Sequence, residues 1–259
     1  SSSAKRILET RLLIKQGSTW NAETYIWNDE QTEATRFIAG KFIPVSWIDE
    51  NGVSQSVSYQ VPNKNECKGC HEYSNGLIPI GPKARHLNKD YAYLDGTTAN
   101  QLEYLANNSM LAGLPGSGTA PKLPVWNDPT DGTIDNRARA YLDINCGHCH
   151  NPNGPANNSG LNLEYHVTNP AEWGVCKSPI AAGNGSGGRL YDILPGNPDG
   201  SILVYRMEVN DADIRMPELG RSIEHEEAVT LIRQWITEMP QQSAKPYRRL
   251  FILRYSHSR

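Results

Sequence analysis

Two Cys-x-x-Cys-His pentapeptides constrain this chain more than any other feature of its sequence. The first spans residues 67–71 and the second spans residues 146–150. This spacing attaches c-type haem: two thiols three positions apart reach the two vinyl groups of one porphyrin, and the adjacent histidine ligates the iron. The sequence therefore predicts two covalently bound haem c groups. The expected thioether cysteines and proximal iron ligands are Cys67, Cys70 and His71 for the first haem, and Cys146, Cys149 and His150 for the second.

Paired cysteines have two other common uses, and both fit this sequence less well. A four-thiolate zinc ribbon places its pairs roughly 15–20 residues apart, whereas far more chain separates residues 70 and 146. Zinc binding also does not need the histidine that follows each pair. A thioredoxin-like site needs one pair near a βαβ pattern, and neither flank shows that pattern.

Composition limits the fold and the partners. The chain has 259 residues, enough for one large domain or two small ones. Its hydrophobic content is 38%, and its 22 glycines and 17 prolines predict much irregular backbone. The net charge of −3 gives no support for binding to nucleic acid or to an anionic membrane surface. No apolar run long enough for an integral membrane span is present.

Localisation follows from the cofactor. Covalent haem c is attached outside the cytoplasm in bacteria and archaea, so we expect a periplasmic or extracellular protein at or beyond the cell surface. Ser1 is not preceded by a charged and apolar leader, which suggests that a targeting sequence has been removed. The fifth cysteine, Cys176, has no haem to bind; we expect a buried free thiol, and the alternatives are an intermolecular disulfide or a partner cysteine in a missing segment.

The predicted fold is mainly α with much irregular structure, an N-terminal β-rich segment and two cytochrome c-type haem modules. Short β-branched and aromatic runs separated by turns predict strands over residues 1–62, including a hairpin whose turn is Asp49–Gly52. Residues 63–120 form the first haem module, with a helix expected at 97–108, and residues 121–134 form a linker rich in glycine, proline and aspartate.

Residues 135–239 form the second haem module. A helix capped by Asp135 is expected to lead into Cys146, and an amphipathic helix over 224–236 is expected to close the module. Residues 240–259 are basic and without a sustained pattern, which predicts an extended tail.

The order of these features resembles a class I cytochrome c domain: a helix, the haem motif, a long loop, a Met-Pro pair and a closing helix. The resemblance implies that the first and last helices cross and that a methionine sulfur is the distal iron ligand. The matching residue is Met216, in Arg215–Gly220. A lone methionine is more often a core filler, but its position before Pro217 and the closing helix favours ligation.

The distal ligand of the first haem is less constrained. His86 follows the first motif in a loop that can fold back over the ring, and we favour it, ahead of Met110 and Met207. The remaining alternatives are an open position or one of three other histidines, His166, His225 and His257.

Arginine pairs bidentately with carboxylates. Haem propionates are carboxylates, so arginines near the haem motifs are candidate partners for them, with solvated surface charge as the alternative. The candidates are Arg85, Arg139 and Arg215.

Several phrases resemble a family of periplasmic or extracellular diheme c-type cytochromes, from near Thr10 to near Glu238. They are Ile80–Asn88, Arg137–Asp143, Asn145–Pro152, Pro195–Ser201 and Arg215–Gly220. The resemblance implies electron transfer.

The leading hypothesis is therefore an electron carrier, not an enzyme, that passes single electrons between a redox protein donor and an acceptor. One alternative is a homo-oligomer, as the subunit of a polymeric extracellular cytochrome filament. Another is an enzyme, either a diheme peroxidase or the haem subunit of a dehydrogenase.

Overall fold

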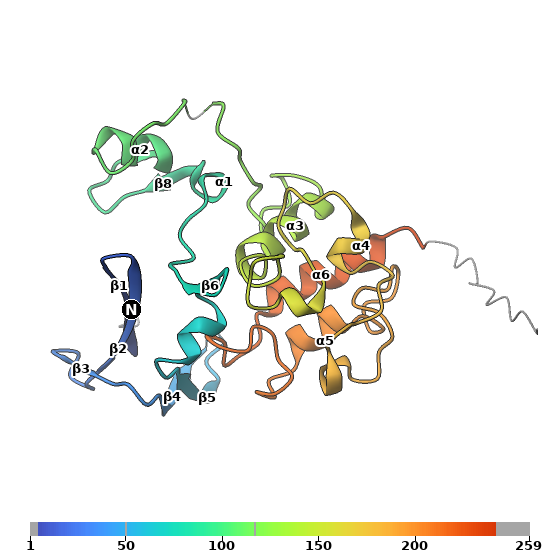
Figure 1. Cartoon of the computed structure of the whole chain (residues 1–259), viewed down its shortest axis with the longest axis horizontal. Helices are drawn as coiled ribbons and strands as arrows, with labels where there is room; N and C mark the ends of the chain where they lie inside the picture. The colour runs from blue at the N-terminus through green and yellow to red at the C-terminus, as the bar shows by residue number, and fades with distance from the viewer. Residues whose placement is uncertain (1–4, 50, 117, 242–259) are drawn as a thin grey trace, which may run out of the picture.

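The computed structural model of the chain describes residues 5–49, 51–116 and 118–241. Its architecture is mixed: antiparallel β-sheets occupy the N-terminal part, and six α-helices joined by much irregular backbone follow. The strands between residues 9 and 36 and the helices between residues 202 and 238 lie on opposite sides of the molecule (Figure 1). The expected β-rich start and irregular helical remainder are confirmed, although the strand content is higher than a mainly α fold implies.

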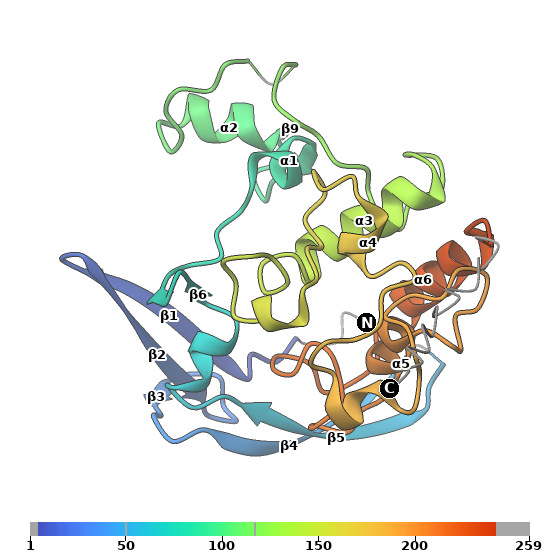
Figure 2. The ribbon, with the colours of Figure 1, turned by 45° about the vertical axis from the view of Figure 1, so that its right-hand side comes forward.

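The N-terminal part consists of two small sheets. Strands β1, β2 and β3 form one antiparallel sheet, and β4 and β5 form a hairpin (Figure 2). Asp49 shapes the hairpin turn because its carboxylate accepts hydrogen bonds from the backbone N–H groups of Asn51 and Val53. The predicted hairpin is thus confirmed. The strands are β1 (Glu9–Gln16), β2 (Thr19–Trp27), β3 (Ala34–Arg36), β4 (Lys41–Ile48) and β5 (Ser54–Val61).

Short elements follow around the first haem motif. A 3-10 turn, Glu66–Gly69, carries the motif, and the two-stranded ribbon of β6 (Glu72–Tyr73) and β7 (Gly76–Leu77) comes directly after it. The predicted helix at 97–108 is present as the shorter α2. The other elements are α1 (Ala84–Leu87), β8 (Asp90–Ala92), β9 (Thr98–Asn100) and α2 (Gln101–Asn107).

The main hydrophobic core lies between α3 and α6. Apolar side chains at helical spacing on the two helices face each other, and α5 packs on the same core. Both long helices were expected, and both are confirmed. The elements are α3 (Ile134–Asn145), α4 (Pro170–Trp173), α5 (Ile202–Glu208) and α6 (Glu226–Glu238), with 3-10 turns at Asn157–Ser159 and Gly183–Ser186.

The residue that caps the N-terminus of α3 is not the expected one. Thr133, not Asp135, is the capping residue, and its hydroxyl accepts a hydrogen bond from the N–H of Asn136. Asp135 lies in the first turn and accepts a hydrogen bond of 2.8 Å from Nε1 of Trp235 on α6. The carboxylate therefore joins the two core helices in addition to complementing the helix dipole.

Three further expectations concern single features. Cys176 is exposed, so the expected burial of this thiol is wrong. No helix among the described residues combines the length and the hydropathy that crossing a bilayer requires. The expected tail over 240–259 lies outside the described residues from position 242 onward.

Candidate functional site

Each haem motif folds as a single helical turn. In the first, the carbonyl of Cys67 accepts hydrogen bonds from the N–H groups of Cys70 (3.3 Å) and His71 (2.9 Å). In the second, the carbonyl of Cys146 accepts in the same way from the N–H groups of Cys149 (3.1 Å) and His150 (2.9 Å). Residues three and four apart share one face of such a turn. Each pair of thiols and its histidine are thereby presented to the same side.

The protonation state of His150 is fixed by its neighbour. Its Nδ1 lies 3.0 Å from the hydroxyl oxygen of Ser159. That hydroxyl donates its single hydrogen to the carbonyl of Ala156, at 2.7 Å, and can only accept from the imidazole. Nδ1 therefore carries the hydrogen, and the lone pair of Nε2 is available to a metal.

His71 is held in the same tautomer by the backbone. Its Nδ1 lies 3.3 Å from the carbonyl oxygen of Ile78, which accepts hydrogen bonds and cannot donate. In return, the N–H of Ile78 donates to the carbonyl of His71 at 2.9 Å. The β6–β7 ribbon makes this double contact by returning the chain to the motif. In the neutral form of both motif histidines, the lone pair is therefore on Nε2.

One cavity brings together the predicted ligands of the second haem. Cys146, His150 and Met216 all line it, although the methionine is distant in sequence. Its walls are mostly apolar and come from several elements, with Leu163 and Val229 among them. Cys149 lines the adjoining cavity, which Cys146, His150 and Met216 also line. An apolar enclosure with an imidazole and a thioether is the surrounding that a haem ligated by histidine and methionine would need.

The segment that carries Met216 is held in place by two arginines. The guanidinium of Arg221 donates a 2.7 Å hydrogen bond to the carbonyl of Met216, and the N–H of Met216 donates to the carbonyl of Arg206 at 2.7 Å. Both arginines line the cavity. Arginine can pair with the propionates that a haem carries. Neither residue was identified from the sequence, because only folding brings Arg206 next to Met216.

Burial sets the charge states inside this cavity. It lowers the pKa of His150 to about 4, so the imidazole is neutral at neutral pH and able to bind a metal. It also raises the pKa of Cys146 to about 12, so this thiol stays protonated.

The arginines proposed for the propionates lie elsewhere. Arg85 forms a bidentate pair with Asp143, and Arg139 donates to the carbonyls of residues 164, 165 and 167. Arg215 donates to the side chain of Gln60 and to two backbone carbonyls. None of the three is among the residues that line the cavity of the second motif.

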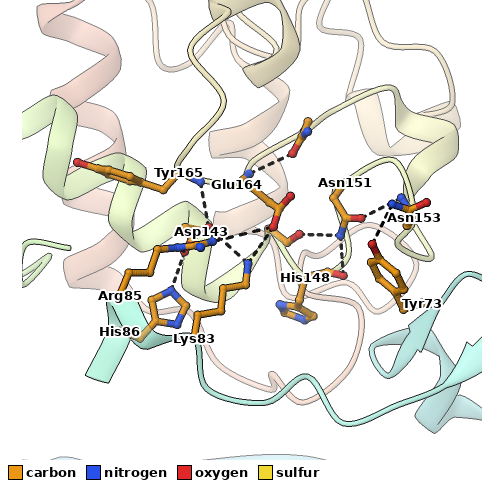
Figure 3. A network of polar contacts seen from close by, with 12 residues as sticks. Tyr73, Lys83, Arg85, His86, Asp143, His148, Asn151, Asn153, Glu164 and Tyr165 are labelled. Atoms are coloured by element: carbon orange, nitrogen blue, oxygen red, sulfur yellow. Dashed lines mark hydrogen bonds and ion pairs between the residues drawn. The ribbon is translucent and has the colours of Figure 1, made fainter. Parts of the chain in front are cut away.

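A smaller cavity adjoins the first motif. Cys67, Cys70 and His71 line it together with residues of β1 and β2, such as Leu13 and Ala22. His86 is not among its lining residues. Instead, Nε2 of His86 lies 2.6 Å from a carboxylate oxygen of Asp143 (Figure 3). The placement of His86 gives no support to its predicted role as distal ligand.

None of the alternative ligands among the described residues lines the cavity of the first motif. Met207 and His225 line the cavity of the second motif. Met110 is exposed, as is His166, and His257 lies outside the described residues.

The two motifs meet at a cluster of three side chains. The ligand atoms of Cys70, His148 and Cys149 all lie within 4.8 Å of one another. Hydrogen bonds from Cys149 and His148 lower the pKa of Cys70 to about 4, while the same contact raises the pKa of Cys149. This cluster could not be predicted from the sequence, because nothing in either motif indicates where the other lies.

Comparisons of the chain with protein-family models, with curated proteins and with solved structures found no match.

Proposed function

We propose that this protein is a diheme c-type cytochrome that carries single electrons between redox partners outside the cytoplasm. The observation that supports this proposal most is that the histidines of both motifs are held in the same tautomer. In both motifs a hydrogen-bond acceptor orients Nδ1–H of the histidine, which places the lone pair of the neutral imidazole on Nε2. A structural histidine has no need of this arrangement, whereas a metal-ligating histidine almost always has it.

The residues proposed to bind haem form two sets, one for each haem. Cys67 and Cys70 would hold the first haem, with His71 as its proximal ligand. The second would be held by the corresponding residues of motif 146–150, with Met216 as distal ligand and Arg206 and Arg221 beside it. Haem iron, when bound in this way, supplies reversible one-electron chemistry. The chain contributes attachment, ligand orientation and an apolar surrounding.

Counting attached haem tests this proposal. The full chain is produced with a signal peptide in a bacterium that attaches haem c, and haem is measured by intact mass and by the pyridine haemochrome spectrum. We expect two haems per chain in the wild type and one in each of two variants, Cys67→Ser/Cys70→Ser and Cys146→Ser/Cys149→Ser. Cys176→Ser, the control, should retain two. A wild-type chain without covalent haem would contradict the proposal.

The cluster at the meeting point of the motifs favours one other function, a site for a soft or borderline metal ion such as zinc. Two thiol groups and an imidazole, from Cys70, Cys149 and His148, already lie within reach of one ion. For this function, haem-free chain should copurify with one zinc per chain by elemental analysis. Cys70→Ser should then lose the metal, and Cys67→Ser should retain it.

A smaller effect is expected at Ser159. Its hydroxyl accepts the hydrogen of His150 Nδ1, and such outer contacts raise the basicity of the ligand. A more basic imidazole stabilises ferric iron, so Ser159→Ala should raise the reduction potential of the second haem and leave the haem count at two. Spectroelectrochemical titration measures this. Ser186→Ala, whose hydroxyl accepts from Gly188 in a loop outside this cavity, is the control.

A further inference from the structure

The two haem motifs are in direct contact, although a long stretch of chain separates them. The thiol of Cys149 lies close to that of Cys70, within the 4.8 Å that spans the cluster. The thiol of Cys149 also donates a hydrogen bond to the carbonyl of Gly69, at 3.5 Å. The second cysteine of each motif is thus the part that meets the other motif.

The contact continues beyond these thiols, in the segments that follow the two motifs. The N–H of Ser74 donates to the carbonyl of Asn153 at 3.1 Å, and the side-chain amide of Asn153 donates to the hydroxyl of Tyr73 at 3.0 Å (Figure 3). Both links join the ribbon after the first motif to the loop after the second. The relative position of the two motifs is therefore fixed by several bonds.

A shared cavity lies at the same place. Its volume is about 470 Å³, and residues of both motifs line it, including Cys70 from the first and Cys149 from the second. Met216 lines this cavity as well as the apolar cavity beside His150. The shared cavity beside the second motif therefore extends to Cys70 of the first motif.

We propose that the chain holds its two haems as a closely spaced pair whose attachment edges meet at Cys70 and Cys149. This inference rests on the proposed function and adds that electrons are exchanged within the chain. Cys70 and Cys149 would each hold one porphyrin edge through a thioether bond, so their adjacent sulfurs would bring the two edges together. The pair would supply one-electron exchange in which one iron is oxidised as the other is reduced, with no further reactant.

Close spacing also couples the two sites electrostatically. The interaction between two charges varies inversely with their distance and with the effective dielectric constant, and the latter is low inside a protein. The charge gained by one iron on oxidation therefore opposes oxidation of the other. The potential of each site should depend on the state of its neighbour.

The first test needs no haem. In full-length, haem-free chain with Cys67→Ser, Cys146→Ser and Cys176→Ser, only Cys70 and Cys149 remain. Diamide should link them within one chain, detected by peptide mass mapping. The matched control carries Cys70→Ser, Cys149→Ser and Cys176→Ser, and its remaining thiols, which line different cavities, should stay free. Equal linking in both chains, or none in the first, would overturn the proposed contact.

The second test uses the holoprotein. Soret-region circular dichroism is recorded for the wild type and for the two single-haem variants described above. A close pair should give the wild type a bisignate signal that the summed spectra of the variants lack. Two attached haems with additive spectra would overturn the pair and leave the proposed function intact. A wild-type chain without covalent haem would overturn both.

Discussion

Alanine in place of Asp143 is expected to lower the free energy of unfolding by about 3–5 kcal/mol, the range for breaking a buried ion pair on one side. The carboxylate is 1% exposed and accepts two hydrogen bonds from Arg85, at 2.7 and 2.9 Å. His86 and the N–H of Tyr165 also donate to it (Figure 3). Removing the anion leaves these donors without their acceptor. Urea unfolding followed by far-ultraviolet circular dichroism measures the loss.

The control for this variant is Asp199→Ala. Asp199 also pairs with an arginine, Arg233, but its side chain is 80% exposed. Surface changes of this kind stay within about 0.5 kcal/mol. Equal losses for the two variants would show that burial of the Asp143 network contributes nothing.

The same network should make stability depend on pH. Burial by itself would raise the pKa of Asp143, but the hydrogen bonds from His86, Arg85 and Tyr165 outweigh it and hold the pKa well below its usual range. A carboxyl group of this kind stabilises the fold above its unfolded-state pKa of about 3.9. The stabilisation declines as the pH falls below that value. Wild-type and Asp143→Ala unfolding free energies should therefore converge in acid.

Met216→Ala is expected to have the largest effect on the electronic properties of the proposed second site. A thioether opposite histidine raises the reduction potential. Its loss should lower that potential by on the order of 0.1 V, within the roughly 0.8 V that axial ligands span. The thioether-to-iron charge-transfer band in the red should disappear from the ferric spectrum. Spectroelectrochemical titration of the holoprotein records both changes.

Met110→Ala is the matched control, because Met110 is 71% exposed and does not line the cavities beside either motif. It should preserve the band and both potentials. Retention of the band in Met216→Ala would exclude this residue as the ligand.

Local patterns in the sequence predicted the parts of the fold that depend on local chemistry. The hairpin turn at Asp49 and the helices α3 and α6 follow from turn residues and apolar spacing, and all are present. The contact between the two helices is expected only from the resemblance to a class I cytochrome c domain; in the structure it buries an apolar face of each helix.

The contacts within the candidate site depend on folding and could not be predicted in this way. The hydroxyl of Ser159 contacts His150 although a loop separates them in sequence. The thiols of Cys70 and Cys149 lie close together although a long stretch of chain separates them. The sequence predicts His86 as a ligand because it follows the first motif in a loop that can fold back over the ring. Its partner in the structure is Asp143, which only folding brings close to it.

The two acceptors that orient the motif histidines differ in how they can change during evolution. At the second motif the acceptor is the side chain of Ser159, so one codon change can remove or alter it. At the first motif it is the backbone carbonyl of Ile78, which every amino acid retains. In the proposed cytochrome, selection could adjust the potential of one haem by substitution at this position while the orientation of the other histidine stays constant. The difference between the two potentials, which sets the direction of electron flow, would then be an evolvable property of the chain.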